Sequence, residues 1–193
     1  MRYKYGGESV SEDESEVEKI YRSGNRVYFY EDISRESVIR LKEELEKTMN
    51  ECVKIGMEYK IEPRIELHLY SNGGDVFMGL DVYNFIKRSE VAIDTYIDGM
   101  IASAATFIYL GGEKRFISEY NHMLIHQLST SFWGKYEDLS DEFKNSKSLM
   151  ECIKDLYKQN TTIPKKILDE LLRRELLLNT DECLKYKIAT DKI

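Results

Sequence analysis

The chain has 193 residues, a charged fraction of 33% and a formal net charge of −7. This length suits one domain that buries a sizeable core without cross-links, and the acidity argues against a nucleic-acid-binding surface. No apolar run reaches the roughly 20 residues of a membrane-spanning helix, and the first residues lack the apolar core of a secretory signal.

The three cysteines, Cys52, Cys152 and Cys183, are odd in number and far apart, without a C-x-x-C pair. Such spacing is typical of free thiols in a reducing compartment rather than of a disulfide framework or a zinc site. We therefore expect a cytoplasmic protein that binds no metal and needs no cofactor.

The first part of the chain is polar and acidic, most of all between about Gly6 and Glu18. A segment with so few apolar residues cannot bury enough surface to order itself. We predict a flexible acidic N-terminal segment over residues 1–24 and a folded domain over residues 25–193. The alternative for the segment is a contact arm that becomes ordered on a partner.

The first strand is predicted at Arg26–Tyr30, where β-forming residues follow Gly24 and Asn25. A helix is predicted from about Ser34, a good N-cap residue, to about Ile55. Its apolar residues recur every three or four positions and give the helix one buried stripe. The stripe consists of Val38, Leu41, Leu45 and Met49.

The alternating run Ile65–Tyr70 predicts the next strand, which leads into the turn Ser71–Asp75. Gly73 and Gly74 allow the backbone of this turn to approach another group closely. A second helix follows, and then a strand at Val91–Ile97. The apolar stripe of that helix consists of Val76, Leu80, Tyr83 and Ile86.

The stretch Gly99–Phe107 indicates a strand that ends at the glycine and a helix of small residues with Ser103 near its first turn. The N–H groups at a helix start have no partner within the helix and carry the positive end of its dipole. An oxygen that must become an anion is stabilised there. Ser103 is therefore a candidate nucleophile; the alternative is a small hydroxyl that only packs among alanines.

Later in the chain, short strands are predicted at Arg115–Ile117 and His122–His126, a long helix at Tyr136–Tyr157 and a shorter helix after Pro164. The run Leu176–Glu182 indicates a strand that ends in a helix cap. This alternation of strands and helices predicts an α/β fold of one domain, with a mostly parallel sheet or stacked βαβ units.

His126 is the histidine best placed for chemistry, because it follows an apolar run at a predicted strand end. The alternative is an imidazole bonded to the backbone, which spacing alone favours, and His68 is expected to pack within its strand or lie at the surface. A nucleophilic serine needs a base, a carboxylate that orients the base, and N–H donors for the oxyanion. The residues alone leave the carboxylate open among Asp169, Glu175 and Asp181.

Four short motifs follow one another along the chain: Ser71–Gly74, Gly99–Ser103, Lys114–Phe116 and Met123–Gln127. Together they resemble the patterns S-P-G-G, G-x-A-A-S-M, G-K-R and M-I-H-Q of the Clp protease proteolytic subunit family. Each motif alone is a weak signal, but four in order at about the family's spacing are a strong one. The resemblance is closest from Ile65 to His126 and looser in the rest of the chain.

The resemblance implies a role for individual residues. Ser103 falls on the family nucleophile, His126 on the general base, and Glu175 on the aspartate that orients the histidine. The N–H groups of Gly74 and Ala104 fall on the oxyanion hole. The implied function is a self-compartmentalising, ATP-dependent serine endopeptidase with the ClpP/crotonase-type fold of stacked βαβ units. The implied assembly is a homo-oligomer of stacked heptameric rings, fed with unfolded polypeptides by an AAA+ unfoldase ATPase.

Four departures from the family pattern bear on this function. Asn72 replaces the proline of S-P-G-G, and Ala104 replaces the methionine after the serine, where the donor is main chain. Glu175 replaces the orienting aspartate with a longer side chain, so either the backbone shifts or the rate falls. The acidic N-terminal segment also differs from the family's pore-lining start. These differences indicate a divergent or phage-encoded member.

Two alternative functions follow from the same residues. A catalytically impaired ring or scaffold subunit is motivated by Glu175, because replacing the corresponding carboxylate in a well-studied triad lowers kcat by about 10⁴. A crotonase-fold acyl-CoA enzyme shares the oxyanion geometry. It needs no serine–histidine pair, so the motifs around Ser103 and His126 argue against it.

Overall fold

The computed structural model describes residues 18–193. The predicted acidic N-terminal segment lies outside the described residues as far as residue 17. Its last part, however, belongs to the sheet: Ile20–Ser23 forms β1, which pairs antiparallel with β2 at Arg26–Phe29. The folded domain therefore includes residues before 25. Pairing with β2 and burial of Ile20 fix this strand, and neither is visible in the local composition.

Within the described residues, eight strands form one sheet in the order β1-β2-β3-β4-β5-β8, with β6 paired to β4 and β7 paired to β6. The central strands β3 (Ile65–Ser71) and β4 (Ile93–Ala102) run parallel to each other and to their neighbours β2, β5 and β6. The remaining strands are β5 (Arg115–Ile117), β6 (His122–Leu124), β7 (Leu177–Leu178) and β8 (Asp191–Lys192). The predicted α/β fold with a mostly parallel sheet is confirmed.

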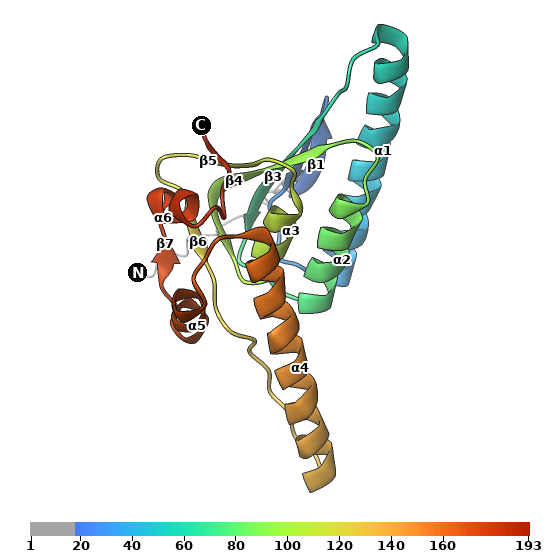
Figure 1. Cartoon of the computed structure of the whole chain (residues 1–193). Helices are drawn as coiled ribbons and strands as arrows, with labels where there is room; N and C mark the ends of the chain where they lie inside the picture. The colour runs from blue at the N-terminus through green and yellow to red at the C-terminus, as the bar shows by residue number, and fades with distance from the viewer. Residues whose placement is uncertain (1–17) are drawn as a thin grey trace, which may run out of the picture.

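Six helices complete the described chain, and Figure 1 shows α1, α2 and α3 on one side of the sheet and α4 projecting away from the body. They are α1 (Arg35–Tyr59), α2 (Val76–Lys87), α3 (Ala105–Gly111), α4 (Tyr136–Asn160), α5 (Lys165–Arg173) and α6 (Thr180–Lys185). The core lies between the sheet and the first three helices, and the C-terminal half of α4 packs against it.

The start of α1 follows from local chemistry. Ser34 is its N-cap, and the Ser34 hydroxyl accepts a hydrogen bond from the N–H of Ser37 while the Ser37 hydroxyl accepts one from the N–H of Ser34. Such reciprocal caps satisfy two donors that a helix start leaves free. The predicted stripe is confirmed, because Val38, Leu41 and Leu45 are buried and Met49 packs against the core. The helix extends four residues beyond the predicted end at Ile55.

The region around Gly99 differs from the prediction. The strand β4 does not end at the glycine but continues to Ala102, because Met100–Ala102 pairs with β6. The helix α3 begins only at Ala105, so Ser103 lies in the turn before the helix and not in its first turn. A pairing between segments 22 residues apart therefore decides where this strand ends.

One face of the sheet carries a ladder of stacked rings across β1 to β5. The rings belong to Tyr21, Tyr28, His68, Tyr96 and Phe116, with neighbouring centroids 4.6–4.9 Å apart. His68 lies in the middle, and its Nδ1 is 2.9 Å from the carboxylate of Asp98. The expected packing role of His68 agrees with this position.

The helix α4 has two unlike halves. Near its C-terminal end, Ile153, Leu156 and Tyr157 are buried in the body. At its other end, the side chains of Tyr136 and Phe143 are 80% and 72% exposed. The helix is therefore anchored at one end only, as its projection in Figure 1 shows.

Candidate active site

The backbone at Ser103 adopts a conformation that is rare for a side-chain-bearing residue. Its φ angle is 55°, in the left-handed region. The N–H of Ser103 donates to the carbonyl of Leu124 at the end of β6, over 3.0 Å, and the Ser103 carbonyl accepts from the N–H of Thr106, also over 3.0 Å. The hydroxyl of Ser103 makes no hydrogen bond within residues 18–193 and is half-buried. A strained turn therefore presents a free hydroxyl.

A glycine turn lies directly against the Ser103 turn. Gly73 has a φ of 99°, and a Cβ atom there would be 2.6 Å from the Cβ of Ser103 and 3.2 Å from the nitrogen of Ala104. Gly74 has a φ of 141°, and a Cβ there would be 2.2 Å from the carbonyl oxygen of Ile33. Only glycine fits either position, for reasons of both backbone conformation and space.

The segment before α1 clamps this glycine turn. The N–H of Ile33 donates to the carbonyl of Gly73 over 2.7 Å, and the N–H of Asp75 donates to the carbonyl of Ile33 over 2.9 Å. These two bonds fix the peptide units on both sides of Gly74. The sequence analysis missed the role of Ile33, because nothing in the local pattern connects it to a turn forty residues later.

Two main-chain donors beside Ser103 are unused. In the part of the chain that the structure describes, neither the N–H of Gly74 nor that of Ala104 donates a hydrogen bond. They belong to the two turns that touch through Gly73. Unpaired N–H groups at a nucleophile are the chemical requirement of an oxyanion hole. The two N–H groups can therefore stabilise an oxyanion that forms when Ser103 attacks the carbonyl group of a substrate.

His126 lies at the end of the neighbouring strand. The parallel pairing of β4 with β6 places Ala102 opposite Leu124, so Ser103 and His126 follow at adjacent carboxyl ends. Active groups gather at these ends in parallel sheets. The imidazole of His126 is half-buried and makes no hydrogen bond to any residue of 18–193. It is free to act as a base, and the expected alternative, a bond to the backbone, is absent from that range.

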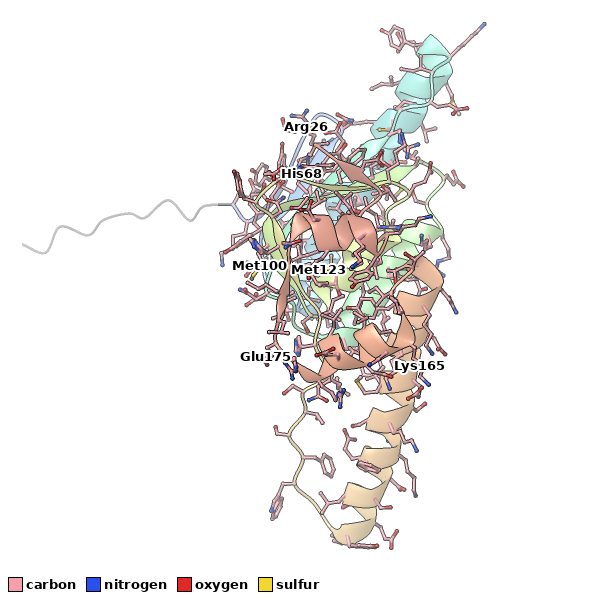
Figure 2. The ribbon with its side chains drawn as sticks, turned by 60° about the vertical axis from the view of Figure 1, so that its left-hand side comes forward. Arg26, His68, Met100, Met123, Lys165 and Glu175 are labelled. Atoms are coloured by element: carbon pink, nitrogen blue, oxygen red, sulfur yellow. The ribbon has the colours of Figure 1, made fainter. Side chains whose placement is uncertain are left out.

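The pairing of β6 with β7 brings Glu175 towards His126. Leu124 lies opposite Leu177 in this antiparallel pair, and the N–H of Gln127 donates to the carbonyl of Leu172 over 2.8 Å. If this register continued for two residues beyond the paired strands, it would set His126 opposite Glu175. Figure 2 shows Glu175 on the segment that joins α5 to β7. Its side chain is exposed and forms no ion pair with the described residues.

The other two candidate carboxylates have different surroundings. Asp169 lies on α5 and pairs with Lys154 of α4, at 3.4 Å. Asp181 belongs to the first turn of α6, which follows β7 in the sequence. Strand register therefore favours Glu175 over both. No hydrogen bond or ion pair joins Ser103, His126 and Glu175 to one another within the described range, as is common for catalytic groups without substrate.

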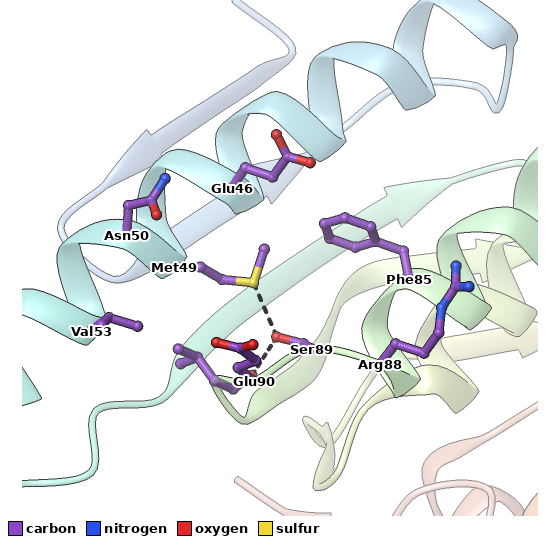
Figure 3. A pocket seen from close by; sticks show the side chains of 9 residues that line it. Glu46, Met49, Asn50, Val53, Phe85, Arg88, Ser89 and Glu90 are labelled. Atoms are coloured by element: carbon purple, nitrogen blue, oxygen red, sulfur yellow. Dashed lines mark hydrogen bonds between the residues drawn. The ribbon is translucent and has the colours of Figure 1, made fainter.

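A groove of about 770 Å³ begins at the glycine turn. Its walls are the start of α2 with Phe77, the segment from Leu128 to Thr130, and the middle of α4 as far as Cys152. A second groove, of about 440 Å³ between α1 and α2, appears in Figure 3, where the Ser89 hydroxyl contacts Met49. Of these two grooves, the first borders the candidate site, through Gly74.

Groups of histidine, cysteine and acidic side chains that suit a metal ion do not occur among residues 18–193. None of the helices described is long and apolar enough to cross a membrane. The chemically active groups of this candidate site are the hydroxyl of Ser103, the imidazole of His126, the main-chain donors and the candidate carboxylate of Glu175.

Comparisons with known proteins identify the family of the chain. The sequence model of the family described as Clp protease matches residues 22–193. Two relatives are each an "ATP-dependent Clp protease proteolytic subunit". The one from Deinococcus radiodurans is 28% identical over 135 residues, which cover 68% of this chain and 66% of that protein. The one from Adiantum capillus-veneris is 27% identical over 167 residues, covering 83% and 84%.

The fold is also that of a solved relative. A mutant of ClpP1 from Listeria monocytogenes superposes with a TM-score of 0.68 at 24% identity, covering 85% of this chain and 88% of that one. The alignment with the Deinococcus protein spans about two thirds of that relative's length. The match to the family model, over residues 22–193, includes every residue of the candidate site.

Proposed function

The chain belongs to the Clp protease family, and from this premise we propose that it is a serine endopeptidase subunit with Ser103 as its nucleophile. Its substrates are peptide bonds of unfolded polypeptides. The observation that carries the proposal is the contact between the Gly73–Gly74 turn and the turn that contains Ser103. A free hydroxyl on a strained backbone lies beside two unused N–H donors, at a strand end adjacent to a free imidazole.

In this mechanism each group has one task. The Ser103 hydroxyl attacks the peptide carbonyl while His126 takes its proton, and His126 later gives that proton to the leaving amine. Glu175 holds the imidazole in the correct tautomer and stabilises its charged form. The N–H groups of Gly74 and Ala104 bind the oxygen that becomes negative. The reaction needs neither a metal nor a cofactor.

We propose that the chain works as a self-compartmentalising homo-oligomer of stacked heptameric rings in the cytoplasm, with an AAA+ unfoldase as partner. The names of the relatives, which specify an ATP-dependent proteolytic subunit, support this. So does the free half of α4: Trp133 beside it is 95% exposed, and Tyr136 and Phe143 are also exposed. Large aromatic side chains in such positions are enriched at protein–protein interfaces.

A fluorophosphonate probe and a fluorogenic peptide test the proposal directly. We expect the probe to label the wild-type oligomer on Ser103, and Ser103→Ala to lose both labelling and peptide cleavage. Ser23→Ala, which changes an exposed serine of β1, is the matched control and keeps both. Wild-type protein that assembles but neither reacts with the probe nor cleaves the peptide would refute the peptidase assignment.

One observation favours a second function, a catalytically impaired ring subunit. The orienting carboxylate is an exposed glutamate, and no bond joins it to His126 within the described residues. This alternative expects normal assembly without cleavage. It is excluded if the wild-type protein turns over peptide at a rate that falls when Glu175 is replaced by alanine.

A further inference from the structure

A buried pair of hydroxyls connects α4 to the turn that carries Ser103. The hydroxyl of Tyr157 lies 2.5 Å from Oγ1 of Thr106, and both side chains are buried. The same Oγ1 lies 2.6 Å from the carbonyl oxygen of Ser103. Two consecutive hydrogen bonds therefore run from the buried end of a long helix to the candidate nucleophile.

Chemistry fixes the direction of both bonds. A carbonyl oxygen only accepts, so Thr106 donates its hydroxyl proton to Ser103. Threonine has a single hydroxyl proton, so the bond between Thr106 and Tyr157 must use the proton of Tyr157. Burial raises the pKa of Tyr157 above its ordinary value, so this donor keeps its proton throughout the neutral pH range.

The turn at Ser103 depends on such restraints. A non-glycine residue with a φ of 55° costs about 1–3 kcal/mol and persists only where its surroundings hold it. The Ser103 carbonyl accepts from both the N–H and the hydroxyl of Thr106. Donation from Tyr157 polarises that hydroxyl and strengthens its bond to Ser103, because hydrogen bonds in series reinforce one another.

Tyr157 also fixes the position of α4 against α3. Its ring packs edge-on against Phe107, with centroids 6.0 Å apart, and it is one of three buried residues of α4, all of them in the C-terminal half. A displacement of α4 therefore reaches the Ser103 turn through Tyr157.

We propose that Tyr157 is a positioning residue for Ser103, acting through Thr106, so that the placement of α4 sets the placement of the nucleophilic hydroxyl. This inference rests on the proposed role of Ser103. Sequence patterns do not reveal it, because Thr106 and Tyr157 are 51 positions apart and each fits a buried helical stripe.

Removal of one oxygen tests the proposal. Tyr157→Phe keeps the ring but not the donor, and we expect kcat for a fluorogenic peptide to fall about tenfold at unchanged KM, since small misplacements of a nucleophile cost rate. The reaction of Ser103 with the fluorophosphonate slows by the same factor. Tyr109→Phe is the matched control, because Tyr109 is equally buried and donates to the carbonyl of Phe116 over 3.2 Å. Its kcat stays within about twofold of wild type.

Variants of Thr106 show whether the effect passes through this residue. Thr106→Ser keeps the hydroxyl and is expected to keep kcat. Thr106→Val keeps the shape but loses the hydroxyl, and it lowers kcat at least as much as Tyr157→Phe. In the Thr106→Val background, Tyr157→Phe adds no further loss, because the two groups act in series.

Amide hydrogen exchange gives a readout that needs no catalysis. In a peptic fragment that contains Ser103–Phe107, exchange is expected to be several times faster in Tyr157→Phe than in wild type or Tyr109→Phe. A Tyr157→Phe protein with wild-type kcat and wild-type exchange overturns the proposal, as does an equal loss of kcat in Tyr109→Phe. Wild-type protein that fails to label at Ser103 refutes the peptidase function instead, and exchange then still shows whether α4 restrains this turn.

Discussion

The two sides of the candidate site are held in different ways. On one side, the main chain holds the candidate nucleophile: Gly73 and Gly74 lie within contact distance of Ser103 and Ile33, and hydrogen bonds fix Ile33 to the glycine turn and Ser103 to Leu124 and Thr106. On the other side, His126 and Glu175 project from strand ends as side chains without hydrogen bonds to the rest of residues 18–193.

This contrast explains where the chain departs from its family. Both glycines are retained, because any Cβ would collide with backbone or with Ser103. The replacement of aspartate falls on Glu175, where the side chain is exposed and has room to adjust. Asn72 also has an exposed side chain, so the loss of proline there leaves the glycine contacts intact. Sites built from main chain tolerate little change, whereas sites built from free side chains tolerate more.

The largest loss of peptide cleavage is expected from adding a methyl group to the glycine turn that contacts Ser103. Gly73→Ala places a Cβ 2.6 Å from the Cβ of Ser103, which must move. We expect peptide cleavage to fall at least about 100-fold, the order of loss for a misplacement near 1 Å. Gly24→Ala is the control, because Gly24 also has a positive φ of 61° but no neighbouring atom within 4 Å. It lowers the melting temperature and keeps activity, and an active Gly73→Ala enzyme would contradict the assigned rigidity.

A smaller effect is expected on the adjustable side. Glu175→Gln removes the charge that we propose orients His126, and we expect kcat to fall about ten- to a hundredfold, less than the roughly 10⁴-fold loss in a buried triad. Glu175→Asp restores the family residue and keeps at least the wild-type rate. Glu170→Gln, a change at a nearby exposed carboxylate that pairs with Arg174, has no effect on kcat. If Glu175→Gln cleaves peptide as fast as wild type, another group orients the histidine.

The smallest effect on peptide cleavage is expected from a change outside the candidate site, at the hydrogen bonds of Asp98. These bonds do not position Ser103, His126 or Glu175. Burial of Asp98 by itself raises its pKa, but hydrogen bonds from His68 and Tyr30 outweigh this and lower it below the ordinary 3.8. A lowered pKa means that the carboxylate stabilises the fold above pH about 4, and that this stabilisation is lost as the pH falls through the folded-state pKa.

Tyr30→Phe removes the 2.6 Å bond to Asp98. We expect the free energy of unfolding at pH 7 to drop by about 1–2 kcal/mol, with unchanged peptide cleavage. The difference between the two proteins, measured by urea unfolding, shrinks as the pH is lowered below about 4, because Asp98 then becomes protonated in both. A difference that is the same at pH 3 and pH 7 would show that the carboxylate charge plays no part.

Much of the local structure could be predicted from the chain. The cap at Ser34 and the stripe of α1 depend on residues within one helix, and the alternation in β3 depends on one strand. The cap of α6 at Asn179 was likewise visible as a strand that ends in a polar residue. In each case the determining contacts join residues that are close in sequence.

The strand boundaries that were predicted wrongly depend instead on contacts between residues that are far apart in the sequence. β4 continues past Gly99 because β6 supplies hydrogen bonds to it, and β1 exists because β2 pairs with it. The left-handed conformation of Ser103 requires the carbonyl of Leu124 on one side and Thr106 on the other. Residue propensities and hydrophobic periodicity describe one segment at a time, so they do not reveal which strand it will pair with.

The sequence by itself determined the fold class and the residue types of the site. Four motifs with their spacing are enough to identify the family, and two of their residues, Gly73 and Gly74, are retained where a Cβ atom has no room. Only the tertiary structure decided how these residues meet. The parallel pairing of β6 with β4 puts His126 and Ser103 just beyond adjacent strand ends, the register of β7 favours Glu175 over Asp169 as the candidate carboxylate, and a buried hydroxyl on α4 is hydrogen-bonded to Thr106, which bonds the Ser103 carbonyl. These placements depend on hydrogen bonds between segments far apart in the chain, whose partners no local pattern specifies.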